Sequence, residues 1–208
     1  LSGWVNNLYK NSCGAFIRRE IWACLAPGHP EIAVKYAQMD AEVDHADEGV
    51  YAEIFCAAME SAAFVENDVN KIVEIGLSYL PKNCGVKRAI NSVIKSRSEN
   101  LSWKEAFFEL MKIEPSSFSG REGWTDLNGN RIEAGEIGYS APGNVGIAIM
   151  GLLYGEGDFE KSITIAMNCG EDTDCTVATV GAIFGIIYGE DSIPKKWIAP
   201  IGTKISTC

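Results

Sequence analysis

The sequence predicts an all-α fold, a single domain over residues 1–208 in which many short helices cross at steep angles. Apolar residues recur every three or four positions along most of the chain, which is the period of an amphipathic helix, and no segment alternates as a strand would. Proline, glycine and capping residues separate these periodic stretches. The stretch 176–189 is almost free of charge, as expected for a helix buried on most sides.

The helix boundaries follow from local start and stop signals. Pro30 stands at the first turn of a helix, where its missing N–H costs no hydrogen bond. Asp68 and Asp158 are placed to cap helices, and Ser102 forms a capping box with Glu105. The predicted helices, in chain order, are 15–24, 30–43, 49–65, 68–80, 85–97, 102–113, 144–154, 159–167 and 176–189.

Two features of the second half of the chain lead to further expectations. Residues 115–141 are rich in Gly, Ser and Asn and are expected to form one long irregular segment, which in a compact domain usually has a function or is mobile. Gly181, Gly185 and Gly189 recur every four residues on the last long helix. This spacing predicts a flat face for a close helix crossing.

The run 168–176, Asn-Cys-Gly-Glu-Asp-Thr-Asp-Cys-Thr, places two carboxylates two residues apart, where a glycine-containing turn leads into the last long helix. Acids in a first turn complement the unpaired N–H groups and the helix dipole, so Asp172 and Asp174 fit a capping role with solvated side chains. One acid would be enough to cap, however, and the turn gathers several oxygen donors suited to Mg²⁺, Mn²⁺ or Ca²⁺. The residues alone leave both interpretations open.

The stretch 170–189, GEDTDCTVATVGAIFGIIYG, closely resembles the C-terminal signature of the ADP-ribosylglycohydrolase family, which includes the dinitrogenase-reductase-activating glycohydrolases. That signature is a Gly-x-Asp-Thr-Asp pattern followed by a helix of small residues. The stretch 12–18 is similar to the family's glycine-rich loop, and 40–45 is similar to its Asp-Ala-x-x-Ser/Thr-His segment. Residues 152–159 precede the signature as they do in bacterial members. The resemblance therefore spans nearly the whole chain, with 115–141 matching least.

The resemblance implies a set of site residues. They are Asp172 and Asp174 as catalytic acids, the same two acids with Cys175 as metal ligands, and Ser12, Cys13, Gly14 and His45 as ligand-binding residues. Within that set, the loop 12–14 would meet the pyrophosphate or the distal ribose of the ligand. Arg18 would either serve the same anion or form a helix salt bridge. Asn144 lies where the family often has a small polar residue near the ligand.

The chain departs from the family pattern in two ways. It has no Gly-Asp-x-x-Gly and no Thr-Asp-Asp-Thr segment, which in the family supply the remaining metal ligands near the N-terminus. We therefore expect a fragment of a larger protein, with the N-terminal part of the domain absent and no activity alone. Cys175 replaces the usual Thr or Ser ligand, and a thiol is a poor ligand for a hard cation.

The activity implied by the resemblance is hydrolysis of the glycosidic bond between ADP-ribose and an acceptor on a protein or a small conjugate, with Mg²⁺ or Mn²⁺ as cofactor. Two other functions stay open. Cys175 and the missing segments favour a noncatalytic module that binds ADP-ribose or a nucleotide. A purely structural role, which the family also includes, is disfavoured because buried acids without a partner are costly.

Composition limits the partners. A net charge of −10 disfavours a nucleic-acid groove, which needs clustered basic residues. The longest apolar run, 177–188, is shorter than the ~20 residues that cross a bilayer. We therefore expect no nucleic-acid or membrane partner, and a cytoplasmic, bacterial protein. The seven cysteines have no zinc-like spacing and are predicted to be reduced core residues, except Cys13 and Cys175.

Overall fold

The computed structural model describes residues 3–7, 9–114, 124–125, 128–132, 140–202 and 204. The predicted all-α fold is confirmed. The elements are the 3₁₀ helix η1 (Phe16–Arg18), α1 (Glu20–Leu25), α2 (Pro30–Ala41), α3 (Glu48–Ala63), α4 (Val69–Ser78), α5 (Gly85–Ser98), α6 (Trp103–Ile113), β1 (Trp124–Thr125), β2 (Arg131–Ile132), α7 (Ala141–Gly155), α8 (Phe159–Asn168), α9 (Thr173–Tyr188), the 3₁₀ helix η3 (Glu190–Ser192) and α10 (Lys195–Ile198).

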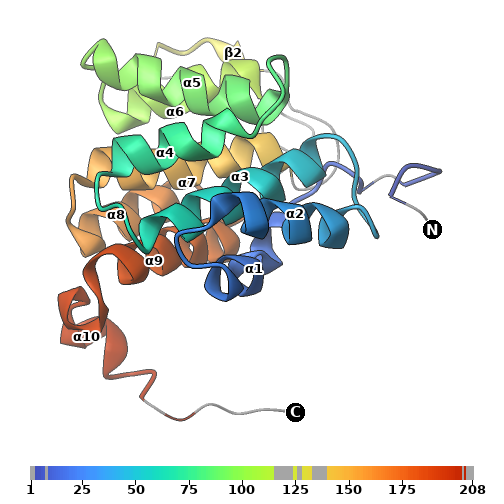
Figure 1. Cartoon of the computed structure of the whole chain (residues 1–208). Coiled ribbons are helices and arrows are strands. Elements are labelled where there is room, and N and C mark those ends of the chain that lie inside the picture. Colours follow the sequence, from blue (N-terminus) through green and yellow to red (C-terminus); the bar gives the residue numbers. More distant parts are fainter. Residues whose placement is uncertain are drawn as a thin grey trace.

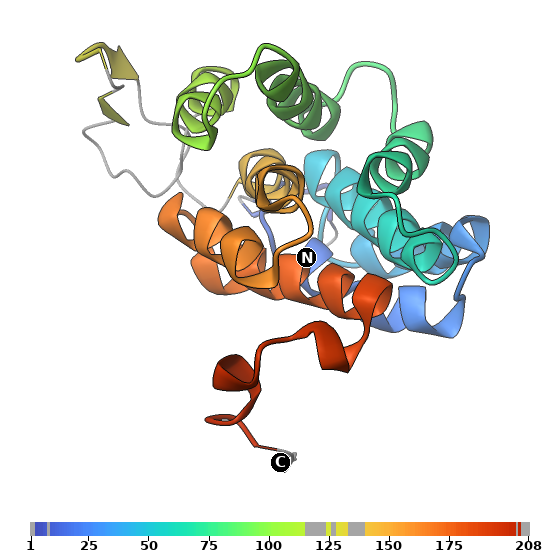
Figure 2. The same ribbon diagram turned by 90° about the vertical axis from the view of Figure 1, so that its left-hand side faces the viewer.

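Helices α3 and α7 form the centre of the molecule (Figure 1). Helix α3 packs against α1, α2, α4 and α9, while α7 packs against α5, α6, α8 and α9, and the two central helices also touch each other. Figure 2 shows α7 lying between the α5–α6 pair and the α8–α9 pair. This arrangement lets α7 contact segments that are far apart in the sequence.

Burial differs between the three most apolar helices. Every residue of α3 except Glu48 and Tyr51 is buried, and so is every residue of α7 except Tyr154. Helix α9 was expected to be buried on most sides, but only one of its faces is fully buried. The buried residues are Thr176, Thr179, Val180, Ile183 and Phe184, which at helical spacing fall on one face. Val177, Ile186 and Ile187 beside this face are half-buried against the core.

The predicted close crossing at the glycines of α9 is wrong for the part of the chain that the structure describes. A methyl group added at Gly181 or Gly185 would meet no atom within 4 Å. Helices approach closely at α7 and α8 instead, where a Cβ at Gly151 would lie 2.8 Å from the Ser162 carbonyl oxygen. Gly189 ends α9 with φ 76°, a left-handed conformation that favours glycine.

The predicted caps are confirmed. The Asp68 carboxylate accepts a hydrogen bond from the Asn70 N–H at 2.9 Å. The Asp158 carboxylate accepts one from the Lys161 N–H at 2.7 Å. The capping box at the start of α6 has both of its hydrogen bonds. Local signals of this kind act within one turn, which is why the sequence alone locates them.

Three predicted boundaries need correction. The helix expected over 15–24 is divided, because η1 ends at Arg18 and α1 begins only at Glu20. Helix α7 begins at Ala141 rather than at 144, since Pro142 falls in the first turn, where proline is tolerated. Helix α9 begins at Thr173, so Asp172 is its N-cap residue and Asp174 lies in its first turn.

The segment 115–141, expected to be irregular, is described only in part. Strands β1 and β2 form a two-stranded antiparallel sheet in which Trp124 pairs with Ile132 and Thr125 with Arg131. Most of the rest of this segment lies outside the described residues. Among the helices that are described, none combines the length and the apolar character that a membrane crossing requires.

Candidate functional site

An open cavity of about 460 Å³ lies where the loop 12–14 meets the turn before α9. Its lining comprises the loop, Ile17 and the turn 171–174. The two segments are about 160 positions apart in the sequence, and each was identified separately as part of a site. The fold therefore brings the predicted ligand loop and the predicted acidic turn to one cavity.

The loop is held in place by the start of α7. Ser12 forms an isolated antiparallel bridge with Ser140, and the Ala141 N–H donates to the Asn11 carbonyl oxygen at 3.0 Å. These backbone contacts fix the loop against the central helix. Gly14 lets the loop approach His45 closely, because a Cβ at this position would lie 3.0 Å from the His45 ring.

Asp172 occupies the N-cap position of α9, but its side chain does not cap the helix. Its carbonyl oxygen accepts the Thr176 N–H at 2.9 Å, as an N-cap residue's should, while its carboxylate accepts no N–H of the first turn. Asp68 and Asp158, at the same position of α4 and α8, both cap with their carboxylates. The capping interpretation therefore does not account for the Asp172 side chain, which faces the cavity instead.

Asp172, Asp174 and Cys175 each offer a ligand atom, and these atoms all lie within 4.8 Å of one another. Asp172 is 9% exposed. Burial raises the pKa of its carboxyl group and the Asp174 charge adds to this, while hydrogen bonds from the Cys175 and Cys13 thiols act in the opposite direction. A divalent cation would offset the burial and the repulsion between the two acids, so the two carboxylates fit such an ion.

The two thiols beside Asp172 are protonated at neutral pH. Burial raises the pKa of Cys175 to about 12, with Asp172 contributing, and raises that of Cys13 well above its usual value. Both groups therefore act as weak S–H donors rather than as thiolates. Cys13 was expected to be a loop exception among the cysteines, yet it is only 3% exposed, whereas Cys24, which was expected in the core, is exposed.

His45 lies behind the loop rather than among the residues that line the cavity. Its side chain is almost fully buried, and its Nε2 lies 3.1 Å from Ser12 Oγ. Its Nδ1 lies 2.7 Å from Asp44 Oδ1. Because the adjacent carboxylate can only accept, Nδ1 carries a proton and His45 presents Nε2 to the Ser12 hydroxyl.

Arg18 was predicted either to bind the ligand's anion or to form a salt bridge, and it forms a salt bridge. Its Nε donates to Asp40 Oδ2 at 2.7 Å, and its two terminal nitrogens donate to Asp44 at 2.7 and 3.1 Å. One of them also donates to the Gly14 carbonyl oxygen at 3.3 Å. Arg18 thus links the loop to the residues that orient His45.

Sequence reasoning passed over Asp44 and gave no role to Glu171, which lines the cavity beside Asp172. Asn144 was noted only by its position relative to the family pattern. A signal for it exists, because Asn144 is a lone amide in the apolar helix 141–155, and such a group is costly to bury unless it is hydrogen-bonded.

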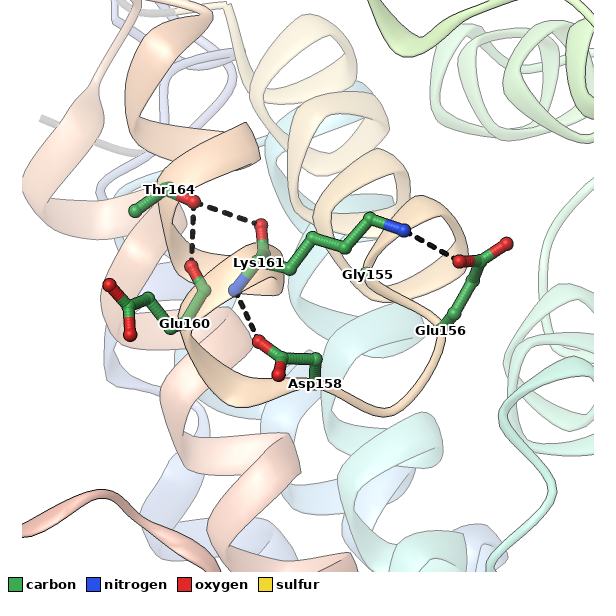
Figure 3. Close-up of a pocket in the computed structure, with 6 residues that line it drawn as sticks. All are labelled: Gly155, Glu156, Asp158, Glu160, Lys161 and Thr164. Carbon is green, nitrogen blue, oxygen red and sulfur yellow. Dashed lines mark hydrogen bonds and ion pairs between the residues drawn. The ribbon is translucent and has the colours of Figure 1, made fainter.

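A second depression lies at the connection between α7 and α8 (Figure 3), where the Glu160 carboxylate pairs with Lys196 Nζ at 2.5 Å. Glu156 pairs with Lys161 Nζ at 2.5 Å, and Asp158 accepts the Lys161 N–H at 2.7 Å. Thr164 Oγ1 donates to the Glu160 carbonyl oxygen at 2.6 Å. These interactions cap the start of α8 and hold the Glu156–Lys161 ion pair. The polar groups of the depression therefore already have partners, and it is not a candidate site.

Comparison with known proteins gives two findings and one negative result. The sequence profile of the ADP-ribosylglycohydrolase family matches residues 3–207. An "ADP-ribosylarginine hydrolase Tri1" from Serratia proteamaculans (strain 568) is 39% identical over 51 residues, which are 24% of this chain and 14% of that protein. No solved structure matches significantly. Because the family profile covers almost the entire sequence, the chain belongs to the ADP-ribosylglycohydrolase family.

Proposed function

We propose that this chain carries the catalytic cavity of a divalent-metal-dependent hydrolase that cleaves the glycosidic bond of ADP-ribose conjugates. The observation that carries the proposal is the Asp172 carboxylate, which stands at a helix N-cap without capping and faces a cavity beside Asp174. The Cys13 and Cys175 thiols give this buried acid only weak hydrogen bonds, so it lacks a strong partner. Membership of the family supports hydrolysis as the activity.

The site residues divide into two groups by their chemistry. Asp172 and Asp174 hold the cation, for which we propose Mg²⁺ or Mn²⁺ because both prefer carboxylate oxygens. When bound, such an ion supplies positive charge that orients ribose hydroxyls and acidifies a water molecule. Ser12 and Gly14, supported by Cys13 and His45, contact the pyrophosphate or the distal ribose. A protonated Cys175 binds a hard cation poorly, so its place is beside the acids as a hydrogen-bond donor.

The proposed reaction is a hydrolysis at the anomeric carbon. Water oxygen bonds to that carbon, the bond to the acceptor nitrogen or oxygen breaks, and the acceptor receives a proton from the attacking water. The products are free ADP-ribose and the unmodified acceptor. The name of the Serratia relative makes an arginine-linked conjugate, on a protein or a small molecule, the first substrate to test.

Two measurements test this function. The protein should bind Mn²⁺ in calorimetry and should release free ADP-ribose from ADP-ribosylated protein in a metal-dependent way. Asp172→Asn should abolish both, whereas Asp191→Asn, which changes an exposed acid of η3, should change neither. Absence of metal-dependent release would contradict the hydrolase.

A second function, a noncatalytic ADP-ribose-binding module, is favoured by Cys175 at the third ligand position. Saturable binding of ADP-ribose that is independent of metal, together with no hydrolysis of any conjugate, would support this module. The dependence of ligand binding on Mn²⁺ therefore separates the two functions.

A further inference from the structure

Asn144 is a buried amide at the junction of the two halves of the cavity. It lies on the first turn of α7 and is 1% exposed. A primary amide has two N–H donors and an acceptor oxygen, and burying it without partners costs on the order of 1–3 kcal/mol in proteins. Its surroundings must therefore supply hydrogen bonds.

The three hydrogen bonds of Asn144 reach three different segments. Its Nδ2 donates to the Ser140 carbonyl oxygen at 3.0 Å and to Cys13 Sγ at 3.2 Å. Its Oδ1 accepts the Asp172 N–H at 3.1 Å. These partners lie in the segment before α7, in the ligand loop and in the acidic turn. The donor and acceptor pattern also fixes the orientation of the amide, since the Asp172 N–H and the Ser140 carbonyl oxygen require an acceptor and a donor at these two positions.

The hydrogen bond to Asp172 matters most for the site. As the N-cap residue, Asp172 has an N–H that α9 does not use, and its surroundings are largely buried. Asn144 satisfies this donor and so fixes the peptide group from which the Asp172 side chain projects. The loop is already joined to α7 through Ser12 and Ser140, so α7 becomes the common support of both segments.

We propose that Asn144 is a positioning residue that holds the acidic turn at a set distance and orientation from the ligand loop. The amide is not among the residues that line the cavity, and acts through the Asp172 peptide group and Cys13. The proposal rests on the proposed function, because it assigns the turn to the cation and the loop to the ADP-ribose ligand. Removal of supporting residues of this kind typically lowers metal affinity about 10–100-fold.

The test compares three variants of the chain. Asn144→Ala removes all three hydrogen bonds, and Asn144→Asp keeps an acceptor for the Asp172 N–H but loses both donors. Ser162→Ala is the matched control, because Ser162 is equally buried and its hydroxyl donates to the Asp158 carbonyl oxygen at 2.7 Å, on α8. Amide hydrogen exchange at Asp172, Mn²⁺ affinity and thermal stability are measured for each variant.

We expect Asn144→Ala to speed exchange of the Asp172 amide by at least about tenfold relative to amides of α5, and to weaken Mn²⁺ binding about tenfold or more. Asn144→Asp should retain protection of the Asp172 amide. Ser162→Ala should lower thermal stability but leave the exchange rate of that amide unchanged.

Unchanged exchange of the Asp172 amide in Asn144→Ala would overturn the proposal. An equal increase of that exchange rate in Ser162→Ala would also overturn it. If no variant and not even the wild type binds Mn²⁺, the proposed function fails, while the exchange result still decides the role of Asn144. Should Asn144→Ala not fold, loss of Asp172 protection in Asn144→Asp would overturn the proposal.

Discussion

His45 joins Ser12 to Asp44, with its Nε2 3.1 Å from Ser12 Oγ and its Nδ1 2.7 Å from Asp44 Oδ1. Arg18 lowers the pKa of Asp44 to about 2, and His45 adds to this, so the carboxylate stays ionised at neutral pH. The proton on Nδ1 is thereby fixed. The hydroxyl that lines the cavity is consequently oriented by residues that lie outside it.

Asp44→Asn should weaken ADP-ribose binding without disturbing the cavity walls. The change keeps the shape of the side chain but removes the charge that orders Arg18 and the His45 tautomer. We expect a loss of about fivefold in calorimetric affinity, the equivalent of about one hydrogen bond. Asp47→Asn serves as the control, because its pair with Lys10 is part-exposed and contributes little. Equal affinities for Asp44→Asn and the wild type would remove Asp44 from the site.

Asp172→Asn should stabilise the metal-free protein and abolish its stabilisation by metal. At neutral pH an ionised Asp172 is opposed by its own burial and by the Asp174 charge, so a neutral amide relieves both. In thermal unfolding without metal the variant should melt above the wild type. With excess Mn²⁺ the wild type should gain several degrees and the variant none. A metal-induced rise of equal size in the variant would exclude Asp172 as a ligand.

The local parts of the fold could be predicted from the sequence, and the tertiary parts could not. Asp68, Ser102 and Asp158 cap their helices as predicted, because each cap is a contact within one turn. Burial of α9 was overestimated because its small apolar residues resemble those of α7. Which faces are covered depends on neighbours, and no periodicity within one helix reveals that.

In the candidate site, too, the local parts could be predicted from the sequence and the tertiary contacts could not. The acidic turn and the loop 12–14 each have a local pattern, and the resemblance to the family identified both. Their meeting depends on α7, and the residue that joins them, Asn144, belongs to neither pattern. Its partners, Cys13 and Asp172, are 131 and 28 positions away. The sequence indicates a hydrogen bond over such separations only indirectly, through a polar residue in a helix that is otherwise apolar.

Gly185→Ala should stabilise the chain, because the added methyl group meets no described atom within 4 Å and alanine favours a helix over glycine. The expected gain is about 0.5–1 kcal/mol in the free energy of unfolding, measured with urea. Gly151→Ala is the matched change on α7, where the Cβ would lie 2.8 Å from the Ser162 carbonyl oxygen, and it should destabilise. Destabilisation by Gly185→Ala would mean that this face of α9 is covered in solution.

Glu53 sits on α3 with no exposed surface, and the polar side chain that faces it is another acid, Asp40. Burial raises its pKa to about 9, and the charge of Asp40 adds to the shift. Glu60, two turns further along α3 and equally buried, has its own partner in Arg19. Replacing each acid by a neutral amide at alkaline pH should therefore have opposite effects on the stability of the folded protein: a gain at Glu53 and a loss at Glu60.

Glu53→Gln should flatten the pH dependence of stability and raise stability at alkaline pH. Because the folded pKa of about 9 lies above the unfolded value of 4.5, folding takes up a proton between these limits. The stabilisation is complete below pH 4.5 and falls as pH rises to 9, by on the order of 1 kcal/mol per unit. Urea unfolding at pH 5, 7 and 8.5 should show the variant gaining on the wild type at each step. Burial raises the pKa of Glu60 to about 7, so Glu60→Gln should instead destabilise at pH 8.5, where it removes the charge that pairs with buried Arg19 and leaves only the pair with Glu20. Parallel curves for wild type and Glu53→Gln would show that Glu53 is ionised in the folded protein.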